Sequence, residues 1–150
     1  YVGMLKDEKR KTGDCGEFLV LYDLTKKGFE LFAPMNNGSL IDIVAIKNDT
    51  SFKIQVKASN KILNDKLVFD IRRSNNVYSE NSFDVLALVD TVNNKVAYLK
   101  WEEMYSRSTI KMRTSDYNRN FHSPHTTVHY FDDHLEFPFR VNEPDILVAH

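Results

Sequence analysis

Residues 39–59 read SLIDIVAIKNDTSFKIQVKAS, and the rest of the chain is organised around them. Residues 40–46 and 52–58 are rich in Ile, Val and Phe, as strands are, and the polar residues 47–51 between them have the composition of a turn. Because successive side chains of a strand point to opposite faces, the second run has one apolar face that fits a protein core. The stretch therefore predicts a β-hairpin at the centre of the fold.

The other face of this hairpin carries a distinctive set of polar side chains. Asp42 lies in the first run, and Gln55 and Lys57 share one face of the second. Pairing would bring a carboxylate, a second oxygen ligand and an ammonium to one point. Phosphodiester cleavage uses such a set, because Mg²⁺ prefers oxygen ligands and activates water, while an ammonium stabilises transition-state charge. A solvated amphipathic hairpin is the alternative.

A helix predicted before the hairpin extends this pattern. Its apolar positions recur at helical spacing, and Gly28 suits the position just after its C-terminus. Glu17 precedes these positions, which predicts a place near the start of the helix, pointing along the sheet edge into the same site. The apolar positions are Phe18, Leu21, Tyr22 and Leu24.

These residues resemble the PD-(D/E)XK nuclease superfamily, and within it the short bacterial homing endonucleases encoded in group I introns. The resemblance covers about the first two-thirds of the chain. It implies an α/β (α+β) fold, a restriction-endonuclease-like core in which a central mixed β-sheet is flanked by helices. The matching residues are Gly16-Glu17, Ile41-Asp42-Ile43-Val44, Gln55-Val56-Lys57, Phe69-Asp70-Ile71-Arg72-Arg73 and Phe83-Asp84-Val85-Leu86-Ala87-Leu88-Val89-Asp90.

The resemblance also implies the roles of the site residues. Asp42, Gln55 and the backbone carbonyl of Val56 would hold Mg²⁺, with Mn²⁺ as a substitute, and Glu17 would complete the ligands. Lys57 would position the attacking water.

Two positions depart from the family pattern. Ile41 replaces the proline of the family name, which makes no metal contact. Gln55 replaces an acidic residue, so that its carbonyl can ligate Mg²⁺ but brings no charge. Some members of the superfamily carry glutamine there and remain active, whereas in others the loss of an acid marks a site used only for binding.

Length and composition predict one ordinary globular domain over residues 1–150, with 42% hydrophobic residues. No run of residues has the length and apolarity of a membrane span, and no secretory signal is visible. Cys15 is the sole cysteine, which excludes an internal disulfide and a cysteine-based zinc site. We therefore expect a cytoplasmic protein without a membrane partner.

Charge is distributed unevenly along the chain. The formal net charge is −1, but residues 1–119 contain 19 of the 20 Lys and Arg residues and carry a net +3, while residues 120–150 carry −4. A basic cleft for DNA can therefore coexist with an acidic far side.

Two segments beside the hairpin are predicted to contact DNA. The turn before Asp42 supplies Asn36, Asn37 and Ser39. A strand at 66–71 leads into a loop whose side chains can bind bases or phosphate, although a solvated loop is the alternative. These residues are Lys66, Arg72, Arg73, Asn75 and Asn76.

The remaining elements are predicted from the same signals. Strands are expected at residues 29–33, 83–91 and 95–100, a polar connection at 59–65 and a short helix at 101–105. A basic and aromatic segment follows, with Arg107, Lys111, Arg113 and Arg119, and it either contacts phosphate or is solvated.

All five histidines lie in the tail, where His125 and His129 with nearby Asp132 and Asp133 have zinc-ligand types. The competing interpretation is strand or packing residues, because Pro124 interrupts a helix there.

Three functions fit the sequence. The first is an intron-encoded, homing-type endonuclease that cuts double-stranded DNA at one site, leaving a 5′-phosphate and a 3′-hydroxyl. It would be a two-fold homodimer at least, since two strands must be cut, and a tetramer would better cover a long target. The second is a structure-specific Holliday junction resolvase. The third is a non-catalytic DNA-binding module whose site is degenerate at Gln55.

Overall fold

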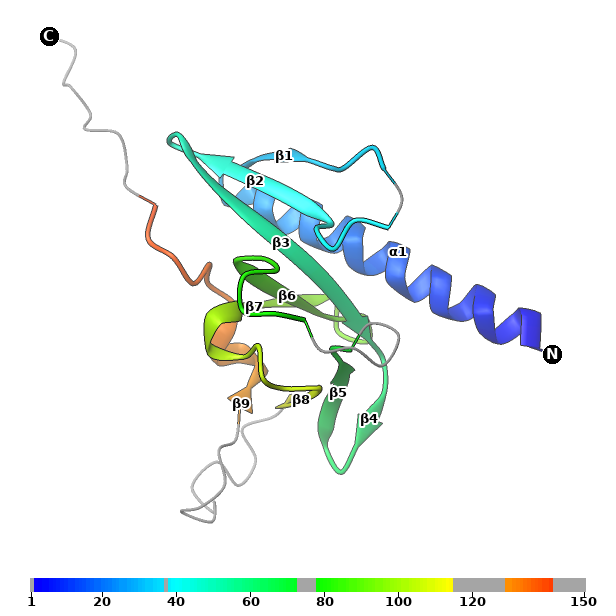
Figure 1. Ribbon diagram of the computed structural model, residues 1–150. Coiled ribbons are helices and arrows are strands. Elements are labelled where there is room, and N and C mark those ends of the chain that lie inside the picture. The colour runs from blue at the N-terminus through cyan, green and yellow to red at the C-terminus, as the bar shows by residue number, and fades with distance from the viewer. Residues whose placement is uncertain (1, 37, 73–77, 115–128, 142–150) are drawn as a thin grey trace, which may run out of the picture.

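The computed structural model describes residues 2–36, 38–72, 78–114 and 129–141. A long helix is followed by two packed sheets (Figure 1). In chain order the elements are α1 (Val2–Lys26), β1 (Glu30–Phe32), β2 (Ile43–Lys47), β3 (Thr50–Ser59), β4 (Ile62–Leu63), β5 (Lys66–Asp70), β6 (Val85–Asp90), β7 (Lys95–Lys100), the 3₁₀ helix η1 (Trp101–Glu103), β8 (Thr109–Arg113), β9 (His129–Tyr130) and the 3₁₀ helix η2 (Phe131–His134).

The central sheet is mixed, with strand order β1-β2-β3-β6-β7. β3 and β6 run parallel, and the other neighbours run antiparallel. The predicted hairpin is present, because β2 and β3 pair from Ile43↔Ile54 to Lys47↔Thr50. Asn48 and Asp49 close it with φ angles of 50° and 63°, the left-handed backbone that two-residue hairpin turns require.

Helix α1 covers one face of the central sheet. Val20 and Leu24 are fully buried and pack with Ile54 and Val85 in one apolar cluster. The helix ends where Gly28 takes a φ of 90°, as the sequence predicts for a glycine C-cap. Among the described residues, no helix combines the length and apolarity needed to cross a membrane.

The start of α1 corrects one prediction. The helix begins at Val2, so Glu17 lies within it and not near its start. Gly13 and Gly16 resemble helix breakers in the sequence, but both lie inside the helix. The cost of glycine there is offset at Gly16 by a close packing contact described below.

A second sheet, with order β4-β5-β8-β9, covers the other face. Leu86 and Leu88 of β6 pack there with Phe69 of β5 and Met112 of β8 around the buried Trp101. Two of its strands differ from the predictions. The expected polar connection at residues 59–65 contains β4, and the basic segment contains β8. The predicted fold class is confirmed, with a helix on one face of the mixed sheet and this second sheet on the other.

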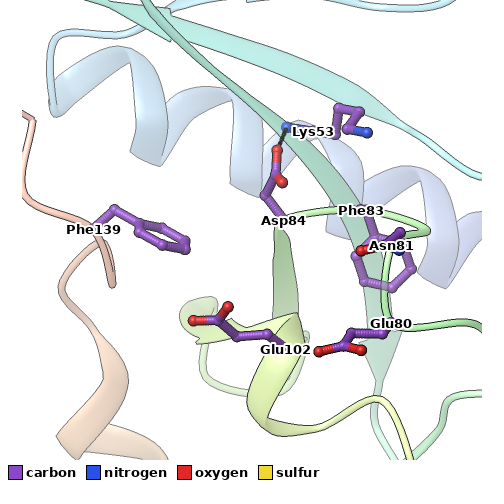
Figure 2. Close-up of a pocket in the computed structure, with 7 residues that line it drawn as sticks. All are labelled: Lys53, Glu80, Asn81, Phe83, Asp84, Glu102 and Phe139. Atoms are coloured by element: carbon purple, nitrogen blue, oxygen red, sulfur yellow. Dashed lines mark hydrogen bonds between the residues drawn. The ribbon is translucent and has the colours of Figure 1, made fainter.

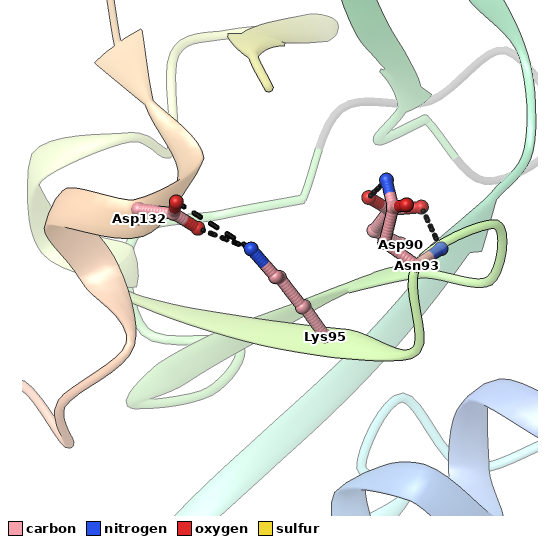
Figure 3. Close-up of polar contacts among 4 residues, drawn as sticks. All are labelled: Asp90, Asn93, Lys95 and Asp132. Atoms are coloured by element: carbon pink, nitrogen blue, oxygen red, sulfur yellow. Dashed lines mark hydrogen bonds and ion pairs between the residues drawn. The ribbon is translucent and has the colours of Figure 1, made fainter. Parts of the chain in front are cut away.

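Asp90 is a buried acid whose role is structural (Figure 3). Its Oδ1 accepts the N–H groups of Val92 and Asn93 at 2.9 and 3.1 Å, and its Oδ2 accepts Asn93 Nδ2 at 2.9 Å. These bonds hold the β6–β7 turn. Nearby, Lys95 pairs with Asp132 at 3.1 Å and joins β7 to η2 (Figure 3).

Candidate active site

Asp42 stands where β2 and β3 begin to pair. Its backbone N–H donates to the carbonyl of Ile54 at 2.9 Å, which continues the hairpin ladder. Its side-chain Oδ2 accepts the N–H of Val56 at 2.8 Å. This bond takes the place of a backbone partner on β2 and fixes the half-buried carboxylate against β3.

Gln55 lies opposite Asp42 when the register is continued by one residue from the Ile43↔Ile54 pair. Its side chain is 7% exposed. Nε2 donates to the carbonyl of Val56 at 3.4 Å, whereas Oε1 is buried without a hydrogen-bond partner among the described residues. A buried carbonyl oxygen without a partner costs free energy, which a bound cation would recover. Gln55 therefore fits the role of a neutral metal ligand.

Glu17 approaches the same place from α1. A Cβ added to Gly16 would lie 2.6 Å from Ala58 Cβ, so only glycine lets the helix backbone come this close to β3. Burial raises the pKa of Glu17, and the negative charges of Asp42 and Asp14 raise it further. The need for glycine at position 16 is visible only in the fold, because Ala58 is 42 residues further along the chain.

The pKa of Asp42 is raised as well. Burial raises the pKa of its carboxyl, and this outweighs the opposing effects of the Val56 N–H and the Lys57 ammonium. The exposed Glu17 and the half-buried Asp42 thus form a pair of carboxylates that repel each other. A divalent cation would relieve that repulsion.

Lys57 extends from β3 on the same side of the strand as Gln55. The residue is half-buried, and its Nζ lies 5.5 Å from the ring centroid of Tyr78, a cation–π contact that orients the ammonium. The buried Tyr78 is a site neighbour that the sequence did not predict, since only the folding of the chain brings it beside β3.

The oxygen donors that the structure offers at this place are the carboxylates of Asp42 and Glu17, the side-chain oxygen of Gln55 and the backbone carbonyl of Val56. In the described part of the chain, no three His, Cys, Asp or Glu side chains gather as a metal site. An all-oxygen set with few charges suits a hard cation such as Mg²⁺. The donors present thus fit a magnesium-type ion.

Comparison with known proteins decides the family. A sequence model described as PD-(D/E)XK endonuclease matches residues 7–136. The chain belongs to this family. The predicted resemblance to PD-(D/E)XK nucleases is confirmed, and the enzyme class that it supports is a DNA endonuclease.

Two relatives add detail to this PD-(D/E)XK endonuclease. Protein 5.3 of Escherichia phage T7 is 30% identical over 108 residues, which are 69% of this chain and 90% of the phage protein. The structure of a bacterial homing endonuclease, I-Ssp6803I, matches with a TM-score of 0.65 and 21% identity, over 73% of this chain and 80% of that one. The second likeness establishes the shared fold.

The predicted DNA-contacting residues of this PD-(D/E)XK endonuclease lie in two regions. Asn36 and Ser39 are exposed in the loop that leads to Asp42, and Ser39 Oγ accepts the N–H of Ile41 at 3.1 Å. Lys66 starts β5, and Arg72 follows that strand, 4.0 Å from Asp70. The remaining predicted residues, Asn37, Arg73, Asn75 and Asn76, lie outside the described residues.

Within the described residues, the histidine-rich tail contains no group of side chains that could hold a metal ion. The rings of His129 and His134 lie 6.0 Å apart, whereas His125 is outside the described part. Burial lowers the pKa of both described histidines. His129 lies in β9, which agrees with the interpretation of this part of the tail as strand or packing residues.

Proposed function

We propose that the chain is a Mg²⁺-dependent endonuclease that cuts double-stranded DNA at a specific site. One observation carries the proposal: the Asp42 carboxylate is fixed on the Val56 N–H, and opposite it in the strand register lies Gln55, whose buried Oε1 has no hydrogen-bond partner among the described residues. Glu17 and Lys57 approach the same place from α1 and β3. Family membership supports the reaction class.

Each residue has a definite task in this proposal. Asp42, Glu17, Gln55 Oε1 and the Val56 carbonyl would hold Mg²⁺, or Mn²⁺ in its place. The bound ion supplies charge for the scissile phosphate and lowers the pKa of water. Lys57 holds the attacking water in line and stabilises negative charge on phosphorus. Water oxygen bonds to phosphorus as the bond to the 3′-oxygen breaks, which leaves a 5′-phosphate and a 3′-hydroxyl.

The proposed substrate is a linear duplex of one sequence, in the manner of an intron-encoded homing enzyme. This choice is supported by the structural neighbour I-Ssp6803I, which is a bacterial homing endonuclease. Asn36, Asn37, Ser39, Lys66, Arg72, Arg73, Asn75 and Asn76 are the proposed DNA contacts.

One chain offers one such site, and a duplex has two strands. The working form is therefore a two-fold dimer at least, and a tetramer would extend the contacts over a long target.

Cleavage of a diverse plasmid library with Mg²⁺ tests the proposal, comparing the wild type with Lys57→Ala. The wild type should cut at one recurrent sequence and give linear product without accumulating nicked circles, because two sites act together. Loss of the ammonium should slow cleavage at least about 100-fold. Cutting by Lys57→Ala at the wild-type rate would refute the site.

Lys53→Ala is the matched control, since Lys53 lies on the same strand as Lys57. It borders a pocket of about 210 Å³ that also holds Glu80, Asp84 and Glu102 (Figure 2). Three carboxylates repel a phosphate backbone, so this variant should keep full activity. If no plasmid is cut, a synthetic four-way junction separates a resolvase, which cuts it, from a binding module, which does not.

A further inference from the structure

The hairpin formed by β4 and β5 is a short two-stranded ribbon at the edge of the second sheet. Figure 1 shows it projecting away from α1 and the central sheet. Leu63 pairs with Lys66 around Asn64 and Asp65, whose φ angles of 52° and 62° make a tight two-residue turn. The tip is thus a rigid, projecting element.

The tip exposes two large apolar side chains. Ile62 and Leu63 are 52% and 51% exposed, although both are large and aliphatic. They stand among polar neighbours, with Lys61 before them and the Asn64-Asp65 turn after them. A mixed apolar and polar tip of this kind matches the edges of bases in a major groove, where thymine offers a methyl group.

A column of positive charge continues from the ribbon onto the next strand. Lys66 of β5 lies directly opposite Arg113 of β8, and Val68 lies opposite Lys111. Like charges in directly opposite positions destabilise a sheet. Among the described residues, no carboxylate forms an ion pair with any of the three cations, and Arg113 Nε is buried without a hydrogen-bond partner. A bound polyanion would neutralise these three positive charges.

The ribbon is tied directly to the strand that carries Lys57. Ser59, two residues further along β3, is buried, and its Oγ donates to the carbonyl of Val68 at 2.6 Å and accepts the N–H of Lys61 at 3.1 Å. The N–H of Val68 donates to the carbonyl of Lys61 at 2.9 Å. Whatever the ribbon binds is therefore held in fixed register with the proposed catalytic lysine.

We propose that this ribbon is the sequence-reading element of the protein: its tip enters the major groove of duplex DNA, and Lys66, Lys111 and Arg113 hold the flanking phosphates. The major groove, about 12 Å wide, admits a two-stranded β-ribbon. The assignment rests on the proposed DNA endonuclease function, and it names the surface that selects the site. A second copy of the chain, paired along the edge strand β4, is the competing occupant.

Phosphate contacts are tested by the salt dependence of binding to a labelled 30-base-pair duplex of random sequence, in EDTA so that nothing is cut. Each of Lys66→Gln, Lys111→Gln and Arg113→Gln should reduce the slope of log K against log salt by about 0.9. The triple variant should bind roughly 10-fold more weakly or worse near 0.1 M salt. Lys26→Gln, an exposed lysine on α1, should match the wild type.

Base reading by the tip is tested by selecting bound duplexes from a randomised pool. Leu63→Ser should change the enriched bases at one or two positions, whereas Val92→Ser should not. Val92 is a suitable control because it is 54% exposed near another hairpin turn. Both substitutions are at exposed positions, and circular dichroism checks that each variant is folded.

The outcomes separate this proposal from the proposed function. If the wild type cuts DNA but the variants show unchanged slopes and unchanged selected bases, the proposed role of the ribbon is wrong and the nuclease function stands. If the variants show reduced slopes but the wild type cuts no DNA, the DNA-binding role of the ribbon is supported and the proposed endonuclease activity is refuted. No duplex binding by the wild type would overturn both. A Leu63→Ser variant that changes only the sedimentation mass would assign the ribbon to a subunit interface instead.

Discussion

At the scale of single residues, Gln55 is the position where the proposed site departs from the family's acidic pattern. A carboxylate there would stand beside Asp42, whose pKa burial already raises, and near Glu17, whose pKa is raised too. The neutral amide avoids a third negative charge in a partly desolvated place while keeping an oxygen available, since Oε1 has no described partner. The substitution is therefore compatible with metal binding.

Gln55→Glu tests this interpretation through stability. Without metal, the added buried charge should lower the free energy of unfolding by roughly 1 kcal/mol or more. With Mg²⁺, the variant should gain more stability than the wild type, because its site binds the ion more tightly. Thermal melts of both proteins with EDTA and with Mg²⁺ measure the difference. Equal metal-induced shifts in the two proteins would remove Gln55 from the ligand set.

Gly16 links helix α1 to strand β3 at the scale of elements. A methyl group at this position would overlap Ala58 Cβ, whereas a Cβ at Gly13 meets nothing within 4 Å. Gly16→Ala should therefore destabilise the protein by about 1–3 kcal/mol and displace Glu17. Gly13→Ala should stabilise it by roughly 0.5–1 kcal/mol, since alanine is the better helix former.

Chemical denaturation of both glycine variants checks these opposite signs, and a double variant checks the cause. Ala58→Gly removes the methyl group that Gly16→Ala would meet. The pair should restore part of the lost stability and of any lost cleavage, which a helix-propensity effect alone would not do. Additive losses in the double variant would argue against the Gly16–Ala58 contact as the cause.

The elements that the sequence predicts well are those with strong local patterns. The β2–β3 hairpin follows from alternating apolar residues around Asn48-Asp49, and the register then brings Asp42 to Gln55. The buried strand β6 follows from its continuous apolar run. In these cases burial and turn chemistry act over a few residues, so the chain order alone carries the information.

Elements that depend on distant contacts were missed. β4 is two exposed residues, Ile62 and Leu63, too few to show a period. β8 does alternate, with Ile110 and Met112 buried between polar residues, but its basic side chains are typical of a surface segment. Gly16 looks like a helix breaker in the sequence, but in the structure it lies inside α1, where its missing side chain lets the helix pack closely against Ala58. No local rule predicts that contact.

At the scale of the whole molecule, two apolar cores lie on opposite faces of one mixed sheet. The core shared with α1 supports Glu17, and the core shared with the second sheet supports Lys57 through Tyr78. The proposed site therefore combines a residue held by α1, on one face of the central sheet, with a residue held by the second sheet, on the other face. Stability of either layer therefore bears on the geometry of the site.

The stability of the second sheet and of η2, which follows it, should depend on pH. His129 and His134 both have pKa values below the usual 6.5, chiefly because of burial. Arg107 and His134 add to the effect at His129, whereas Asp133 and Glu103 oppose it at His134. Below pH 6.5 the unfolded chain then binds more protons at these positions than the folded one does. Their contribution is thus present above the usual pKa and is lost as the pH falls.

Urea unfolding at pH 7.5 and 5.5 measures this effect, with His129→Gln/His134→Gln as the comparison. The wild type should lose more stability than the double variant on acidification, because only the wild type must charge two neighbouring imidazoles. Glu17 and Asp42, whose raised pKa values favour the folded state as the pH falls, are common to both proteins and cancel in the difference. Equal losses would show that the histidine pair does not control the acid stability of this layer.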